Sequence, residues 1–103
     1  MIFTISGRHI EITDAIKKYA REKTSKLPKY YNLINQVEVI VGDGRPGNVS
    51  LEIIARGEHS KMFIVTQTGK DVYQCIDAAV RKLERQLTRK KAKERDDKRT
   101  GGK

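Results

Sequence analysis

The sequence has no tryptophan, two prolines and a single cysteine, Cys75. One thiol cannot form an internal disulfide, so nothing in the sequence points to an oxidising compartment. No apolar run approaches the roughly 18–20 residues that a membrane-spanning helix requires. Residues 1–5 lack the basic start and the long apolar stretch of a secretory signal. These absences predict a cytoplasmic protein with no membrane role.

Residues that carry catalysis or bind metals are also scarce. The two histidines, His9 and His59, are not spaced with other ligand residues in a metal-binding pattern. Cys75 falls in an apolar helical stripe, where an inert core thiol is the usual role. The glycine-rich residues 42–47 lack the Gly-Lys-Ser/Thr ending of a P-loop. The sequence therefore predicts a protein that is not an enzyme and has no catalytic residues, metal, cofactor or small-molecule substrate.

Positive charge, by contrast, is abundant, with a net charge of +9. The excess lies in two segments: residues 13–34 carry six basic and two acidic residues, and residues 71–103 carry eleven basic and six acidic residues. A charge of this size favours a polyanionic partner, which can be nucleic acid, an anionic membrane or an acidic protein. The structure of these two segments therefore decides which partner fits.

Both basic segments have the signals of helices. Thr13 is placed as an N-cap, with Asp14 in the first turn, and Pro28 predicts the end of that helix. Asp71 and Gln74 have the spacing of a capping box at the start of the second helix. Its apolar residues recur at i, i+3, i+4 and i+7 as far as Leu87. The basic residues 94–103 are then expected to form a disordered tail after a folded domain of residues 1–93.

The rest of the chain is typical of strands. The segments with short or alternating apolar patterns are residues 2–6, 36–41, 48–56 and 61–68. The resulting order β-α-β-β-β-α predicts an α+β fold, a two-layer sandwich in which two helices cover one face of a four-stranded sheet. The last three strands are joined by short links and should be antiparallel.

Basic side chains gather on one flank of the second helix when residues are placed at about 100° intervals. Asp77 and Glu84 fall on the other flank. The first helix repeats the pattern, and two helices on one sheet face would bring the basic flanks together, as a surface for phosphate backbones. The residues on this basic flank of the second helix are Arg81, Lys82, Arg85, Arg89 and Lys93, and those off the apolar face of the first helix and past its end are Lys17, Lys18, Arg21, Lys26 and Lys29.

Two features of the first helix leave alternatives open. Lys23 sits within the apolar face, either as an aliphatic stem with its amine in solvent or as a desolvated phosphate contact between the helices. Tyr30 and Tyr31 either stack on bases or sugars or close one end of the core. The strands lack the paired aromatic residues of an RRM sheet, so the helices are the better binding face.

At this point several segments resemble the ribosome hibernation-promoting factor and ribosome-associated inhibitor family of bacteria. They are Ile5-Ser6-Gly7, Glu11-Ile12-Thr13, Lys26-Leu27 with Tyr30, Ile34-Asn35-Gln36-Val37, residues 69–77 (GKDVYQCID) and residues 82–87 (KLERQL). The resemblance implies a fold similar to a double-stranded RNA-binding domain (dsRBD-like) with an additional first strand. It also implies binding to the small ribosomal subunit, in the channel used by mRNA and tRNA, and inhibition of translation when growth slows.

By that resemblance Lys23, Lys26, Lys82, Arg85, Arg89 and Lys90 would contact ribosomal RNA, although Lys90 projects nearer the apolar side of its helix. With Arg81 and Lys93 these form the predicted RNA-binding set, and Lys17, Lys18, Arg21, Lys29 and Tyr30 are additional candidates. With its short basic tail, the protein resembles the short hibernation-promoting type of the family. It is then expected to be a monomer off the ribosome and to favour paired 70S ribosomes with a helper factor.

Two other functions share the same charge pattern. A general binder of structured RNA would show comparable affinity for any duplex RNA and for ribosomes. An interaction module for an acidic protein would use the same helices and would be insensitive to RNase treatment.

Overall fold

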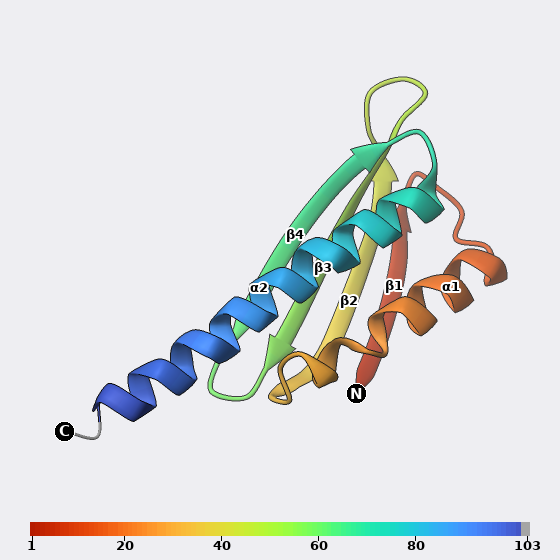
Figure 1. Ribbon diagram of the computed structural model, residues 1–103. Coiled ribbons are helices and arrows are strands. Elements are labelled where there is room, and N and C mark those ends of the chain that lie inside the picture. The colour runs from red at the N-terminus through yellow and green to blue at the C-terminus, as the bar shows by residue number, and fades with distance from the viewer. Residues whose placement is uncertain (102–103) are drawn as a thin grey trace.

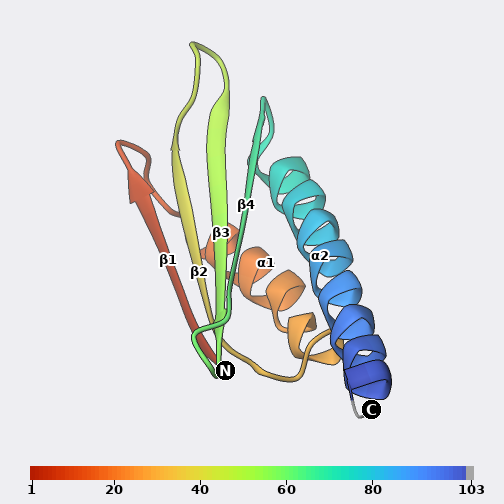
Figure 2. The ribbon, with the colours of Figure 1, turned by 90° about the vertical axis from the view of Figure 1, so that its left-hand side faces the viewer.

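The computed structural model describes the backbone of residues 1–101 and the side chains of residues 1–95. The elements, in chain order, are β1 (Ile2–Arg8), α1 (Asp14–Thr24), the 3-10 helix η1 (Leu27–Lys29), β2 (Ile34–Asp43), β3 (Val49–Gly57), β4 (Met62–Gly69) and α2 (Val72–Gly101). Both helices cover the same face of a single four-stranded sheet (Figures 1 and 2). The predicted two-layer α+β sandwich is therefore confirmed.

The strands lie side by side in chain order, β1-β2-β3-β4. Strand β1 runs parallel to β2, and α1 forms the connection between them, whereas β2, β3 and β4 form the predicted antiparallel meander. Val39 lies opposite Ile53, and Ile53 lies opposite Val65. Because side chains alternate across a sheet, these residues share one face. All three are buried beneath the helices.

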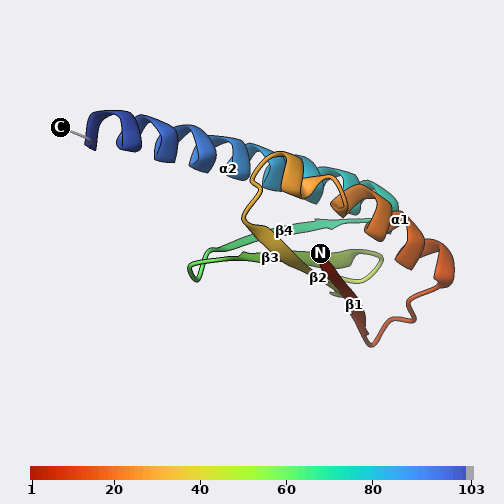
Figure 3. The same ribbon diagram turned by 90° about the horizontal axis from the view of Figure 1, so that it is seen from below.

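Helix α2 contributes more buried side chains to the core than α1 does. Its residues Ile76, Leu83 and Leu87 are completely buried, whereas α1 buries only Ala20 and Thr24. Within residues 1–101 no helix covers the other face of the sheet, as the view along the layers shows (Figure 3). No helix in the described part of the chain has the length and apolar composition needed to cross a membrane.

Helix α1 begins as predicted and ends earlier than predicted. The Thr13 hydroxyl accepts a hydrogen bond from the Ile16 backbone N–H at 3.2 Å, which confirms the N-cap. The helix then stops at Thr24, and Pro28 belongs to the separate η1. The hydroxyls of Thr24 and Ser25 donate to backbone carbonyls of the last turn, at 2.8 Å and 2.7 Å. Such bonds compete with helix continuation.

Helix α2 also begins as predicted, since the Asp71 carboxylate accepts a hydrogen bond from the Tyr73 N–H at 2.9 Å. It continues to Gly101, so its backbone is helical across residues 94–101, where the sequence predicted a disordered tail. The sequence has neither proline nor glycine between Val72 and Gly101 to end the helix. Residues 102 and 103 lie outside the described residues. The division into a domain and a tail at residue 93 stays a prediction.

Candidate nucleic-acid interface

The two helices contact each other through acidic and aromatic side chains. The Tyr19 hydroxyl of α1 donates a hydrogen bond to Asp77 of α2 at 2.7 Å, and this bond raises the pKa of the tyrosine. The Lys23 ammonium lies 3.9 Å from the same carboxylate and 5.3 Å from the centre of the Tyr19 ring. Tyr19 also packs edge-on against Tyr73, with 5.1 Å between ring centres. Asp77 therefore joins the two helices.

This contact corrects one expectation from the sequence. The basic flanks of the helices do not meet along their length, because the flank of α2 that faces α1 carries Asp77 and Glu84. Arg81 shares a groove of about 190 Å³ with Lys23 and Lys26 of the α1 segment. That groove contains both carboxylates as well. Lys23 thus lies between the helices, half-exposed and already close to an acid.

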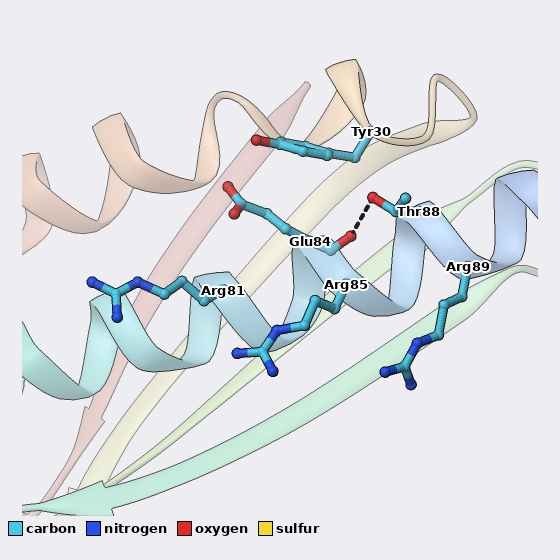
Figure 4. Close-up of a pocket in the computed structure, with 6 residues that line it drawn as sticks. All are labelled: Tyr30, Arg81, Glu84, Arg85, Thr88 and Arg89. Carbon is cyan, nitrogen blue, oxygen red and sulfur yellow. Dashed lines mark hydrogen bonds between the residues drawn. The ribbon is translucent and has the colours of Figure 1, made fainter.

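Three arginines of α2 form a row on its exposed side. Arg81, Arg85 and Arg89 are exposed and lie one turn apart, and their side chains run in the same direction along the helix (Figure 4). Among the residues whose side chains are described, no ion pair engages these three arginines. We call these three residues the arginine row. Their guanidinium groups are free to bind an anionic ligand.

The predicted lysines of α2 are placed differently from one another. Lys82 donates a hydrogen bond to the Thr66 carbonyl of the edge strand β4 at 3.2 Å. It also lines a groove of about 200 Å³ with Arg85, Gln86 and Arg89. Lys90 lies 3.8 Å from Glu94, and Lys93 is exposed. Lys90 is therefore partly used within the protein, in agreement with its position near the apolar side of the helix.

The basic residues of α1 do not all lie near this row. Lys17, Lys18, Lys26 and Lys29 are exposed. The Arg21 guanidinium lies 5.5 Å from the centre of the Phe3 ring of β1, so it covers the side of α1 that is turned away from α2. The structure thus gathers the arginine row with Lys23, Lys26 and Lys82, and it places Arg21 apart from them.

The neighbouring tyrosines after α1 have different environments. Tyr31 is 2% exposed, packs edge-on against Phe63 and donates a hydrogen bond to Glu94 at 2.9 Å. Burial and that hydrogen bond raise the pKa of the Tyr31 hydroxyl to about 12. Tyr30 is only half-buried and lines a groove that also contains the arginine row. Tyr31 therefore closes the core, and Tyr30 belongs to the candidate interface.

Glu84 lines that same groove, of about 420 Å³, together with Thr88. Glu84 is not in the predicted RNA-binding set, because the helical wheel places it on the flank opposite to the basic residues. The wheel showed its position on α2 but could not show that Tyr30 packs beside it. Only the tertiary structure brings these two residues together.

Comparisons with known proteins bear on this interface. Residues 3–95 match a family described as sigma 54 modulation protein / S30EA ribosomal protein. The chain is 34% identical over 96 residues to a ribosome hibernation promoting factor of Salmonella typhimurium, with 90% of this chain and 96% of that one aligned. The corresponding factor of Escherichia coli is 33% identical with the same coverage.

Solved structures agree with the fold. The N-terminal domain of Thermus thermophilus Protein Y aligns with a TM-score of 0.75 and 32% identity, covering 85% of this chain and 96% of that one. A ribosomal subunit interface protein from Coxiella burnetii aligns with a TM-score of 0.81, covering 89% and 99% of the two chains. At 18% identity, the second likeness shows the fold alone.

Proposed function

The chain belongs to the sigma 54 modulation protein / S30EA ribosomal protein family, and we propose that it is a ribosome hibernation factor that binds ribosomal RNA of the small subunit. The observation that carries the RNA-binding face is the arginine row, whose three exposed guanidinium groups have no ion-pair partner among the described side chains. General RNA binding and docking of an acidic protein are the less favoured functions, because family membership points to the ribosome.

The binding would rest chiefly on phosphate contacts. Residues four apart on a helix are separated by roughly 6 Å along its axis, so the arginine row can follow a nucleic-acid backbone. Each guanidinium can make two parallel hydrogen bonds to one phosphate, which a lysine ammonium cannot do. The proposed contacts are Lys23, Lys26, Arg81, Lys82, Arg85, Arg89, Lys90 and Lys93, with Lys17, Lys18, Arg21, Lys29 and Tyr30 as additional ones.

Inhibition of translation would follow from occupation of space. A helix fixed to a sheet by Ile76, Leu83 and Leu87 is a rigid body. Placed in the channel for mRNA and tRNA, it would exclude both ligands without making or breaking a bond and without a metal or cofactor. We propose that this takes place in the bacterial cytoplasm, that the protein is monomeric off the ribosome, and that pairing of 70S ribosomes requires a helper factor.

The test is co-sedimentation of the protein with 30S subunits and 70S ribosomes over a range of salt concentrations. We expect the triple variant Arg81→Gln, Arg85→Gln, Arg89→Gln to bind at least about 100-fold more weakly at physiological salt. The dependence of log affinity on log salt should become shallower by about 0.7–0.9 for each phosphate contact that is lost. Loss of inhibition in a translation mixture should accompany the weaker binding.

The matched control removes the same charge from other exposed positions, in the triple variant Arg8→Gln, Arg45→Gln, Lys70→Gln. This variant should bind much more tightly than the first. An equal loss in both variants would show that net charge alone, and not the arginine row, determines binding. Equal affinity of the parent for an unrelated RNA duplex would favour a general RNA-binding protein instead.

A further inference from the structure

The groove beside the arginine row has two unlike walls. On one side are Arg81, Arg85 and Arg89, and on the other is the half-buried ring of Tyr30 (Figure 4). Its volume of about 420 Å³ lies within the range of small-ligand sites in proteins. A phosphate backbone needs cations, and it does not need an aromatic wall. An unpaired nucleobase, by contrast, stacks on an aromatic side chain and on guanidinium planes.

Glu84 indicates whether this groove holds a phosphate or an unpaired nucleobase. Its carboxylate extends to the same side of α2 as Tyr30, whereas the guanidinium groups of the arginine row point along the other side (Figure 4). Within the described residues it makes neither an ion pair nor a side-chain hydrogen bond. A free carboxylate repels a phosphate. It accepts hydrogen bonds from the N–H groups on the edge of a base, as Glu does with the amino group of cytosine.

The phosphates of such a nucleotide have a place nearby. Arg85 and Arg89 line the Tyr30 groove and also line the adjacent groove that contains Lys82 and Gln86. The second groove has no acidic residue among its lining side chains. One nucleotide can therefore place its base against Tyr30 and Glu84 and its phosphates between Lys82 and the two arginines.

We infer that the groove formed by Tyr30, Glu84 and the arginine row holds one unpaired nucleobase that presents an amino group to Glu84. The inference rests on the proposed function, which supplies the RNA, and it adds a base contact to a surface otherwise described by phosphate contacts. Tyr30 provides the stacking face, and Glu84 favours cytosine, adenine or guanine over uracil, whose single edge N–H lies between two carbonyl oxygens that a carboxylate repels. The protein thus reads one position of the RNA instead of only its charge.

The experiment probes 30S subunits with base-specific reagents, dimethyl sulfate and kethoxal, with and without saturating protein. The parent protein should protect one unpaired base. Tyr30→Leu should lose that protection and bind roughly five- to a hundred-fold more weakly, the range for loss of a base stacked on an aromatic side chain. Tyr30→Phe should behave as the parent, since it keeps the ring. Circular dichroism and the melting temperature check that each variant is folded.

Glu84→Gln gives a test that leaves the fold of the groove intact. Because glutamine keeps one acceptor oxygen and adds an N–H donor, the base protection should weaken, and binding should not tighten. Glu22→Gln, an equal charge change at an exposed position of α1, serves as the control and should leave the protection unchanged. If Glu84→Gln instead tightens binding by severalfold more than the control, the groove holds a phosphate and the inference is wrong. Unchanged protection in both Tyr30→Leu and Glu84→Gln would also overturn it.

The two levels of the hypothesis can fail separately. A parent protein that does not co-sediment with 30S subunits overturns the proposed function and the base contact with it. A parent that co-sediments and yields the expected salt dependence, but protects no base that Tyr30→Leu exposes, overturns the base contact alone.

Discussion

The two ends of the charged part of α2 use their charges in opposite ways. Around Glu94 the charges are paired with one another: Glu94 accepts a hydrogen bond from Tyr31 at 2.9 Å and lies 3.1 Å from Lys61 and 3.8 Å from Lys90. Two turns earlier, the arginine row has no such partner among the described residues. The first set of charges stabilises the fold, and the second is available to a ligand.

The reason for the difference lies in what each turn of α2 faces. The arginine row lies on the exposed side of α2, and among the described side chains no acidic group is within ion-pair distance of it. Glu94 is on the apolar side of the helix, where Tyr31 and the end of the β3–β4 hairpin approach. A charge that faces the rest of the protein must be paired. Charge content alone therefore does not identify a binding surface.

The largest effect on stability should come from the apolar contact between these two regions. Leu87 is a completely buried residue of α2. Leu87→Ala should lower the free energy of unfolding by about 2–5 kcal/mol, since it removes apolar contacts and leaves a cavity. Chemical denaturation measures this loss. Ribosome affinity, corrected for the unfolded fraction, should stay near that of the parent, and a large specific loss of affinity would contradict the division between the two sets of charges.

A smaller effect is expected from Glu94→Gln, which should lower the melting temperature and leave ribosome affinity unchanged. The hydrogen bond from Tyr31 and the nearby Lys61 hold the pKa of the Glu94 carboxyl below its ordinary value of 4.5. A lowered pKa in the folded state gives stability that is present above the ordinary value and is lost as the pH falls through the folded value. The difference in melting temperature between parent and variant should therefore shrink as the pH falls from 7 to about 3.

The control for that experiment is Asp43→Asn, an exposed acid at the end of β2 that takes part in none of the ion pairs of the described residues. It makes the same change in net charge. The melting temperature of this variant should stay close to that of the parent at both pH values. Equal destabilisation by the two variants would mean that net charge, and not the Glu94 contacts, explains the effect.

The smallest effect on ribosome binding is expected at Lys82, which is bonded within the protein and also lies beside the arginine row. Its ammonium donates to the Thr66 carbonyl at 3.2 Å and also lines the groove with Arg85 and Arg89. Because binding a phosphate would compete with that hydrogen bond, Lys82→Gln should weaken ribosome binding only about two- to fivefold. Arg85→Gln, measured in parallel by co-sedimentation, should weaken it more. The reverse order would place the main phosphate contact at the edge of β4.

Local signals in the sequence were sufficient for most of the fold. Thr13 and Asp71 cap the two helices as predicted, because an N-cap depends on groups within three residues. The four strands follow their apolar patterns and require no distant information. The predicted end of α1 was wrong, because the prediction relied on Pro28. The hydroxyls of Thr24 and Ser25, which bond to backbone carbonyls, lie where the helix ends.

The candidate site was only partly accessible to the same reasoning. The arginine row follows from helical spacing, so Arg81, Arg85 and Arg89 could be placed on one exposed side of α2 from the sequence. The environments of Tyr30 and Tyr31 could not be distinguished, because they depend on contacts with Glu94 and Phe63 more than 30 positions away. The role of Glu84 beside Tyr30 has the same origin.

The sequence by itself determined the order of the elements, the apolar stripe of α2 and the excess of positive charge. Each of these depends on neighbouring residues or on composition. Only the tertiary structure decided that Asp77 joins the helices, that Glu94 is paired and that the arginine row has no ion-pair partner among the described side chains. The angle at which α2 packs on the sheet sets which side chains meet, and that angle results from contacts between residues distant in the chain.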